Sequence, residues 1–395
     1  MLTIGFDAKR IVRNSTGLGS YGRTLIRDLA YLPEGLRLRL YAPDKGHDHL
    51  RSQVEGLPRI SLCYPKAGAY LPFDKALWRE HGIVKDLQKD KVQVFHGLSG
   101  ELPWGIRKSG IRSVVTIHDL IFLRHPEFYP WIDGKIYAWK FRRTLKEADH
   151  IIAISECTKR DVLELGQVDP ERVSVVYQSC APRFTNEISP VEQEQIRLQY
   201  GLPKRFILNV GTIEQRKNVL LAVKALPDLP EDLSLVIIGR HTNYTNEMLD
   251  FVNTHDLSRR VFILHNVPDD HLPALYAQAE VFVYPSVYEG FGIPIIEAIS
   301  SGLPVVACTG SCLEEAGGPD NLYVATNDSE ALAAAVRQVL KGAPGREERI
   351  ARSREYIRRF EGNDVATQVL DIYRSLLQPS STNRATVMAS CSDNS

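Results

Sequence analysis

Two glutamates flank a short glycine-containing turn in the C-terminal half of the sequence. Glu289 begins the run Glu-Gly-Phe-Gly-Ile-Pro-Ile-Ile-Glu, and Glu297 ends it. A strand is expected to end near Pro285 and a helix to begin near Pro294, because proline suits the first helical position. Carboxylates accept hydrogen bonds from vicinal hydroxyls. Glu297 could therefore hold a ribose, and Glu289 could hold a sugar ring.

The turn between these glutamates has the properties of an anion site. Gly290 and Gly292 allow the backbone to come close to a ligand. The amides of Phe291 and Ile293 lie at the expected helix start, where backbone donors lack helical partners and the helix dipole is positive. Taken singly, Glu297 is more simply a residue that interacts favourably with the helix dipole, and Glu289 a solvated loop residue. The two together, around one such turn, indicate a function.

A second loop brings two cations together. The apolar run Phe206–Val210 predicts a buried strand, and Gly211, Arg216 and Lys217 follow it. Arginine offers a planar pair of donors and lysine a compact charge, so the two can neutralise a diphosphate as a leaving group develops its charge. The alternative is an exposed charge pair at a helix start. The preceding strand and glycine favour the functional interpretation.

A regular alternation of strands and helices must position these loops. Such alternation predicts an α/β protein with mainly parallel sheets in two Rossmann-like domains that face each other across a cleft. The expected strands are Leu2–Phe6, Leu36–Tyr41, Val92–His96, Ser113–Ile117 and His150–Ile154, then Phe206–Val210, Leu233–Ile238, Val261–Leu264, Val281–Tyr284 and Pro304–Ala307. The expected helices include Tyr21–Tyr31, Lys135–Ala148, Asn218–Leu226 and Glu330–Lys341.

This rhythm breaks between Tyr177 and Gly201 and stops after Pro379. We therefore expect an N-terminal domain over residues 1–185 and a C-terminal domain over 186–362. Residues 379–395 have no periodicity and are expected to form a disordered tail.

The composition limits the class of protein. Hydrophobic residues make up 44% of the 395 residues, and 48 basic side chains balance 48 acidic ones. Zero net charge argues against a nucleic-acid-binding protein, and no apolar run approaches the ~18 residues of a membrane span. No signal peptide is visible, and the scattered cysteines fit the cytoplasm. Cys308 and Cys312 lack a second pair of ligands nearby, so we expect no metal.

The segment from Glu289 to Glu297 resembles the signature of retaining glycosyltransferases of family 4. The resemblance extends over nearly the whole chain, through a glycine loop, a His-Asp pair and the Arg-Lys loop. It implies a GT-B fold, in which the domain over 1–185 binds the acceptor and the domain over 186–362 binds the nucleotide sugar. It places Glu289 at the donor sugar and Glu297 on the nucleotide ribose. It also implies a final helix within 363–378, about Asp364–Leu377, that crosses back onto the N-terminal domain.

The family resemblance also assigns a diphosphate role to the Arg-Lys loop. Many members have an arginine directly after the glycine, where this chain has Thr212. Lys217 is therefore the better match, and Arg216 would have to supply the second charge.

The glycine loop allows two interpretations. Gly17-Leu-Gly19-Ser-Tyr-Gly22 matches the dinucleotide-binding pattern G-x-G-x-x-G. The strand before it ends near Ala8, too far upstream for the tight turn of that pattern. By the family resemblance, a loop that starts the helix Tyr21–Tyr31 instead offers amides to the donor phosphates, with Gly17 and Gly19 as the candidates.

His118 directly follows the strand Ser113–Ile117, at the edge where parallel sheets bind ligands. A lone histidine is more often structural, but family members have one here that contacts the donor sugar, so we take it as a candidate. Asp119 is a weaker candidate and is expected to orient the loop. The helix Lys135–Ala148 is basic and aromatic, so it either touches an anionic membrane or is an ordinary surface helix with an aromatic core side.

The function that these features predict is glycosyl transfer. The catalytic candidates are His118, Arg216, Lys217 and Glu289, and no cofactor or metal is expected. The run His-Asp-Leu-Ile-Phe-Leu-Arg-His-Pro-Glu resembles mannosyltransferases of surface polysaccharide assembly. GDP-mannose is therefore the expected donor, with UDP-glucose or another nucleotide sugar as the alternative, and a glycan or lipid-linked sugar is the expected acceptor. The alternatives are an NAD-dependent oxidoreductase, a non-catalytic sugar-nucleotide-binding protein and an epimerase.

Overall fold

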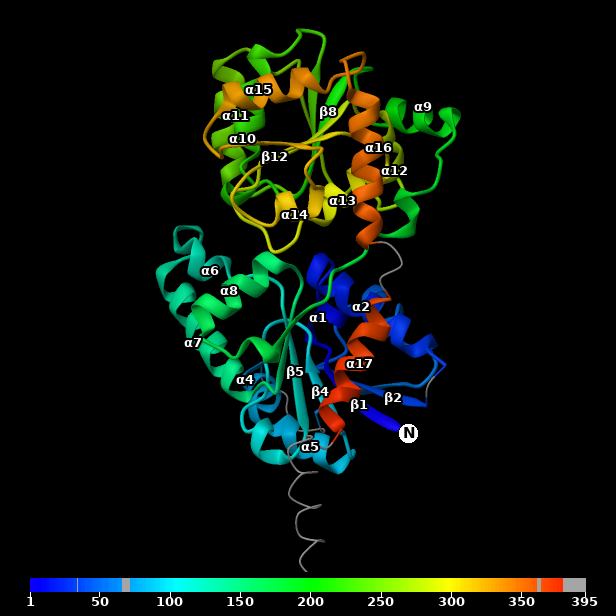
Figure 1. Cartoon of the computed structure of the whole chain (residues 1–395), viewed down its shortest axis with the longest axis vertical. Coiled ribbons are helices and arrows are strands. Elements are labelled where there is room, and N and C mark those ends of the chain that lie inside the picture. Colours follow the sequence, from blue (N-terminus) through cyan, green and yellow to red (C-terminus); the bar gives the residue numbers. More distant parts are fainter. Residues whose placement is uncertain (34, 66–71, 361–363, 379–395) are drawn as a thin grey trace, which may run out of the picture.

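Two parallel sheets form the centres of two domains that lie one above the other along the long axis (Figure 1). The computed structural model describes residues 1–33, 35–65, 72–360 and 364–378. The first sheet contains β1 (Leu2–Asp7), β2 (Leu36–Tyr41), β3 (Ile60–Cys63), β4 (Val94–Gly97), β5 (Arg112–Ile117), β6 (His150–Ala153) and β7 (Val173–Val175). The second contains β8 (Phe206–Val210), β9 (Ser234–Ile238), β10 (Val261–Leu264), β11 (Val281–Tyr284), β12 (Val305–Cys308) and β13 (Leu322–Val324). The predicted fold class is confirmed.

Strand order gives each sheet one point at which the winding reverses. The orders are β3-β2-β1-β4-β5-β6-β7 and β10-β9-β8-β11-β12-β13. The first strand of each domain, β1 or β8, therefore lies between strands that continue the sheet in opposite directions. Loops that follow the strands at such a switch point leave a crevice, and this is where open α/β sheets bind ligands.

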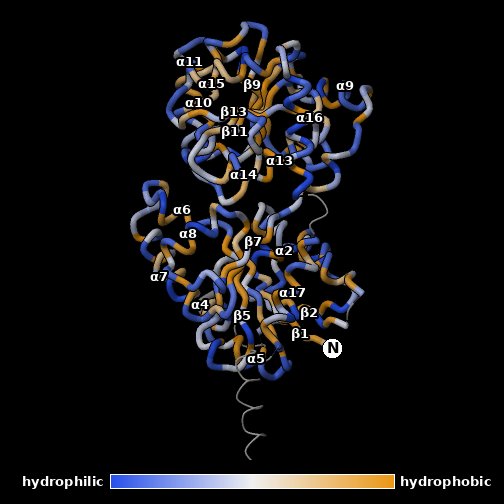
Figure 2. Tube along the Cα trace, viewed as in Figure 1, coloured by the Kyte–Doolittle hydropathy of each residue, from blue (hydrophilic) through white to orange (hydrophobic). Residues whose placement is uncertain are grey.

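Helices cover both faces of the two sheets. Those of the N-terminal domain are α1 (Lys9–Arg13), α2 (Gly17–Tyr31), α3 (Asp48–Arg51), α4 (Pro72–Leu77), α5 (Ile83–Lys89), α6 (Ile121–Arg124), α7 (Trp131–Glu147) and α8 (Glu156–Gly166). Those of the C-terminal domain are α9 (Pro190–Gln199), α10 (Val219–Ala225), α11 (Tyr244–Thr254), α12 (Leu272–Gln278), α13 (Ile293–Ser300), α14 (Leu313–Gly317), α15 (Ser329–Gln338) and α16 (Arg346–Ile357). Central strands such as β11 are buried throughout, and hydrophobic segments gather at the centre of each domain (Figure 2).

The last helix, α17 (Val365–Leu377), lies against the N-terminal domain beside α2 (Figure 1). Val369, Leu370 and Tyr373 are fully buried in the same cluster as the core residues of β1 and β2. The Asp364 carboxylate caps the helix by accepting a hydrogen bond of 2.9 Å from the Thr367 amide. The chain therefore passes between the domains twice. The tail expected over 379–395 lies outside the described residues.

The start of α2 differs from the prediction. The helix begins at Gly17 rather than at Tyr21, so Gly17 and Gly19 lie in its first turn and not in a loop. An added Cβ on Gly19 would collide with the backbone carbonyl of Asn14, and one on Gly22 would press on Ile11. These two glycines thus permit close packing of α1 on α2. The expectation of a glycine loop was wrong because this packing could not be read from the sequence.

A buried apolar cluster continues from one domain into the other. Cys157 of the N-terminal domain belongs to it together with Tyr288 and Phe291 of the C-terminal domain. The Glu315 carboxylate adds two hydrogen bonds across the interface, accepting from the amides of Glu156 at 2.7 Å and Cys157 at 3.1 Å. These amides begin α8, where a negative charge is favourable. The domains are therefore in close contact.

Candidate active site

The two loops that carry the predicted cations and Glu289 lie side by side at the switch point of the second sheet. They follow β8 and β11, which are paired neighbours. The Lys217 Nζ lies 2.5 Å from one Glu289 carboxylate oxygen, and the Arg216 guanidinium lies 3.0 Å from the other. Strand order therefore brings Glu289 to two cations that are distant from it in the sequence.

Local backbone geometry holds the Arg-Lys loop in place. A short 3-10 turn, Gln215–Lys217, ends at Asn218, whose φ of 54° is left-handed, a conformation that asparagine tolerates. The Asn218 side chain donates a hydrogen bond of 2.8 Å to the Thr326 carbonyl. The Arg216 carbonyl accepts one of 2.8 Å from the Val287 amide, which ties this loop directly to the loop of Glu289.

Charge compensation dominates the electrostatics of this cluster. The side chains of Glu289, Lys217 and Arg216 are only 12%, 16% and 17% exposed. Burial alone would raise the pKa of the Glu289 carboxyl, but the charges of Lys217 and Arg216 outweigh it and lower that pKa. Burial alone would lower the pKa of Lys217, yet Glu289 raises it well above the ordinary value. All three groups are therefore ionised at neutral pH.

Tyr284 completes the cluster and was missed by the sequence analysis. The Lys217 ammonium donates a hydrogen bond of 2.6 Å to the Tyr284 hydroxyl, which in turn donates one of 3.3 Å to Glu289. Tyr284 is the last residue of β11, so its place at the ligand-binding end of a strand was a usable signal. Arg216 has two further partners, the Glu214 carboxylate at 2.6 Å and the Tyr288 carbonyl at 2.9 Å.

Glu297 lies apart from this cluster, on α13. In the part of the chain that the structure describes, no hydrogen bond or ion pair joins it to Glu289. Its carboxylate accepts a hydrogen bond of 3.1 Å from the Tyr276 hydroxyl. Burial raises the pKa of Glu297 to about 7, so at neutral pH the group is poised between its neutral and charged forms. Such a carboxyl can exchange its hydroxyl partner for those of a ligand.

The turn between the two glutamates is held by hydrogen bonds from the N-terminal domain and from Cys312. The Gly290 carbonyl accepts hydrogen bonds from Ser155 at 2.6 Å and Thr158 at 3.1 Å, both from the N-terminal domain. The Cys312 thiol donates to the carbonyls of Glu289 at 3.2 Å and Phe291 at 2.7 Å. Cys312 is thus a structural thiol that fixes the turn, a role that the sequence did not reveal.

The individual residues of the turn have distinct roles. Phe291 is buried, with its ring 5.5 Å from that of Tyr177 and 5.2 Å from that of Phe360. Gly292 precedes the first residue of α13, Ile293, with a φ of 119° that only glycine adopts readily. Gly290 was expected to approach a ligand; in the structure its backbone lies against the His118 carbonyl, where an added Cβ would collide with that oxygen.

His118 therefore lies at the domain interface, next to this turn. Its Nε2 donates a hydrogen bond of 2.9 Å to the Leu98 carbonyl, so Nδ1 is left as an acceptor, 3.4 Å from the Gln178 amide nitrogen. The Tyr21 ring packs edge-on at 4.9 Å. Burial lowers the pKa of His118 to about 4, which makes it a neutral imidazole with one acceptor nitrogen at physiological pH.

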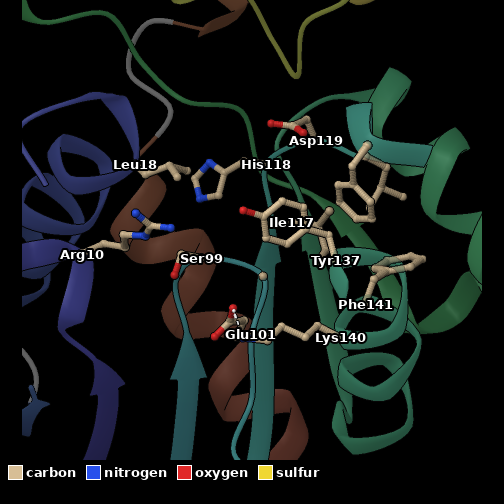
Figure 3. A pocket seen from close by; sticks show the side chains of 13 residues that line it. Arg10, Leu18, Ser99, Glu101, Ile117, His118, Asp119, Tyr137, Lys140 and Phe141 are labelled. Atoms are coloured by element: carbon tan, nitrogen blue, oxygen red, sulfur yellow. Dashed lines mark hydrogen bonds and ion pairs between the residues drawn. The ribbon is translucent and has the colours of Figure 1, made fainter. Parts of the chain in front are cut away.

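Asp119 has the orienting role expected for it. Its carboxylate accepts a hydrogen bond of 3.2 Å from the Ile121 amide at the start of α6. Gly17 and Gly19 lie at the other side of the same region, and Leu18 between them lines a cavity together with His118 and Asp119 (Figure 3). The structure thus brings His118 close to the Glu289 turn and leaves the two glycines on the N-terminal side of the cleft.

Comparisons with known proteins agree with this architecture. Residues 15–179 match the family model Glycosyltransferase Family 4, and residues 192–356 match the model Glycosyl transferases group 1. The two models cover most of both domains, and the chain belongs to the glycosyltransferases of family 4, with a GT-B fold.

Relatives and solved structures resemble the chain over its length. It is 28% identical to O-antigen chain mannosyltransferase B of Escherichia coli over 95% of this chain and 100% of that protein. It is 26% identical to O-antigen chain mannosyltransferase RfbU of Salmonella typhimurium over 65% of this chain and 68% of that one. A glycosyltransferase from Rickettsia africae has the same fold, with a TM-score of 0.76, 20% identity and coverage of 96% and 99%. Anabaena HepE, in complex with UDP and glucose, gives a TM-score of 0.72 at 18% identity with coverage of 95% and 100%.

Among the described helices, none combines the length and the apolar character that a membrane span requires.

Proposed function

We propose that this glycosyltransferase moves a mannosyl residue from GDP-mannose to a glycan or lipid-linked sugar acceptor, with retention of the anomeric configuration. The observation that carries the proposal is the buried cluster of Lys217, Arg216 and Glu289 at the switch point of the C-terminal sheet. The two O-antigen mannosyltransferases among the relatives support mannose as the transferred sugar.

The cluster suits a diphosphate because its cations are already desolvated and oriented. In the structure Glu289 pairs with both cations and Glu214 pairs with Arg216. A diphosphate would share the hydrogen bonds of the cations and free Glu289 to accept from sugar hydroxyls. Lys217 and Arg216 would then stabilise the charge that develops as the nucleoside diphosphate leaves. Glu297, with its pKa near 7, would take the ribose hydroxyls.

The neutral His118 would orient the donor sugar from the other domain. Its acceptor nitrogen can receive a hydrogen bond from a sugar hydroxyl in place of the long contact to Gln178. The candidate Gly19 has its amide bonded to the Thr16 carbonyl at 3.0 Å. The amides of Gly17 and Leu18, in the first turn of α2, would instead face the diphosphate across the cleft. The leaving phosphate would accept the acceptor's proton, so no protein nucleophile and no metal is required.

We also propose that the chain works in the cytoplasm and touches the inner face of the membrane through α7. Its outer side exposes four large apolar residues, Trp131, Ile132, Ile136 and Trp139, by 75%, 64%, 45% and 51%. Lys135, Arg142 and Lys146 are also exposed on this helix. This composition suits the interface of an anionic bilayer, in which apolar groups insert and cations bind headgroups.

The experiment that tests the transfer is a thermal-shift screen against GDP, UDP, ADP and their sugars, followed by product analysis. Ligands that bind only the folded chain raise its apparent melting temperature. We expect the largest shift from GDP-mannose, GDP release when an acceptor glycan is added, and an α-linked product by NMR. A shift without release would leave a non-catalytic binding protein, and a β-linked product would contradict retention. Free altered sugar without acceptor would instead indicate an epimerase.

The oxidoreductase alternative loses its support in the structure. Its glycine pattern lies within α2, where Gly19 and Gly22 pack against α1 and do not form a phosphate-binding turn. A lack of NADH fluorescence change on titration is the expected result.

A further inference from the structure

The N-terminal sheet has its own switch point, between β1 and β4, and a cavity of about 170 Å³ opens there (Figure 3). Arg10 follows β1, Glu101 follows β4, and His118 follows β5. All three side chains line the cavity. The cavity and the proposed donor site are thus alike in origin, since each is lined by residues that follow strands at the switch point of a parallel sheet.

One wall of this cavity is aromatic. Phe122 of α6 lies 5.8 Å from Tyr137 and 6.3 Å from Phe141, both of α7, measured between ring centroids. Tyr137 remains 43% exposed, so part of its ring is free to contact a ligand. The face of an aromatic ring is electron-rich and apolar, and it attracts the C–H groups that cover one face of a pyranose.

The cavity is also lined by a carboxylate that is fixed in place. Glu101 accepts hydrogen bonds from Arg79 at 2.5 Å and from Lys140 at 3.3 Å. Arg79 is itself held by Asp7, with its Nε 3.0 Å from a carboxylate oxygen. Burial alone would raise the pKa of Glu101, but Arg79 and Lys140 lower it to about 2. Glu101 is therefore a permanent hydrogen-bond acceptor, with lone pairs left for hydroxyls, and not a base.

The position of the cavity connects it to the donor site. His118 lines its upper edge, and the His118 carbonyl lies against Gly290 of the C-terminal domain. A molecule in the cavity would thus present its outermost hydroxyl close to the turn that carries Glu289. Glu101 and Asp119 line the cavity together with the cations Arg10 and Lys140, so the lining has no net charge that would favour an acidic sugar over a neutral one.

We propose that this cavity binds the terminal sugar of the acceptor, a neutral pyranose that stacks on Tyr137 and donates hydroxyl hydrogen bonds to Glu101. The proposal rests on the glycosyl transfer proposed above. Lys140 and Arg79 serve as positioning residues for Glu101, and Arg10 supplies donors at the mouth of the cavity.

The test uses the full-length chain with simple probes, the methyl α-pyranosides of mannose, glucose and galactose. Binding is followed by saturation-transfer NMR, with GDP affinity measured in parallel. We expect at least one probe to bind the unmodified chain, and Glu101→Gln and Tyr137→Ala each to weaken it about tenfold or more, as expected for loss of a charged hydrogen bond or an aromatic contact. GDP affinity should be unchanged. Tyr31→Ala, which removes an exposed tyrosine of α2, is the matched control.

Each result separates this proposal from the donor function. If GDP binds but no probe does, or if both variants bind the probes as the unmodified chain does, the acceptor pocket is refuted and the donor site stands. If neither GDP nor any probe binds, the proposed transfer fails and the pocket with it. Tighter binding of methyl glucuronide than of the neutral probes would overturn the neutral class of ligand. If Glu101→Gln lowers the melting temperature of the protein, the probe affinity of Tyr137→Ala alone tests the acceptor pocket.

Discussion

At the scale of single residues, the unusual feature is a carboxylate that pairs with two buried cations at once. Glu289 holds Lys217 and Arg216 in the positions that a diphosphate would need. Breaking a buried charge cluster is costly, so a diphosphate would have to replace Glu289 as the partner of the cations while sugar hydroxyls replace the cations as partners of Glu289. The cluster thus holds both cations at fixed positions at the switch point of the C-terminal sheet.

Replacing Lys217 by alanine should weaken donor binding. A hydrogen bond between charged groups contributes about 1.5–3 kcal/mol, so the dissociation constant of GDP-mannose should rise by roughly 10- to 150-fold. Calorimetry measures this directly. Lys224→Ala, an exposed lysine on α10, is the control and should bind normally. Equal affinities in the two variants would remove Lys217 from the site.

The carboxyl of Glu297 should make donor affinity depend on pH. Its pKa of about 7 means that the ionised form, which accepts hydroxyl hydrogen bonds best, is lost as the pH falls below 7. Affinity for GDP-mannose should therefore decline on acidification, by up to ~10-fold per pH unit. The diphosphate of GDP-mannose does not titrate in this range. Glu297→Gln should flatten the profile between pH 5.5 and 8.5; an unchanged slope would assign the titration to another group.

At the scale of elements, α7 has two faces with different proposed partners. Tyr137, Lys140 and Phe141 line the cavity, whereas Trp131 and Trp139 project outward. The interpretation of this helix as an ordinary one with its aromatic side in the core was correct only for Phe141. A lipid-linked acceptor would meet both faces, with its sugar in the cavity and its chain in the bilayer.

The outer face of α7 gives a prediction about membranes. Replacing both Trp131 and Ile136 by serine should reduce co-sedimentation with vesicles that contain phosphatidylglycerol several-fold, because apolar insertion is lost. Val191→Ser on α9, where the valine is 68% exposed, is the control for loss of an exposed apolar side chain. Equal sedimentation of all proteins, or equal binding to neutral phosphatidylcholine, would refute the contact.

The elements also show which parts of the fold the sequence determines locally. Long apolar runs such as β8 and β11 were predicted with their observed bounds. The edge strands β3, β7 and β13 were missed, because they are short and only partly buried and so lack a clear period. The start of α2 was misplaced because its glycines serve packing against α1.

The candidate site was predictable to a similar extent. Strand ends marked the loops of Lys217, Glu289 and His118, but only the strand order brings the first two into contact. The partners Tyr284 and Cys312 depend on that tertiary arrangement. Their hydrogen bonds to Glu289 and to the turn therefore could not be found by motif.

At the scale of the whole molecule, the donor-site candidates of the C-terminal domain and the cavity of the N-terminal domain meet at a close backbone contact. Gly290 lies against the His118 carbonyl, and Ser155 and Thr158 bind the Gly290 carbonyl from the N-terminal domain. Nucleotide-binding candidates come from the C-terminal domain, whereas His118 and the cavity come from the other. Transfer should therefore require this closed arrangement, but donor binding should not.

The variant Gly290→Ala tests whether transfer needs the closed arrangement of the domains while donor binding does not. The added Cβ would collide with a backbone oxygen, which cannot move aside as a flexible side chain does, so the domains should be held apart. A displacement of about 1 Å between reacting groups can reduce the rate ~100-fold. We expect a loss of transfer of this order, an increased radius of gyration in X-ray scattering, and nearly unchanged affinity for GDP. Gly134→Ala on α7, where an added Cβ meets nothing within 4 Å, should behave as the unmodified chain. Full activity of Gly290→Ala would mean that the contact opens during turnover, and that catalysis takes place in an arrangement of the domains different from this one.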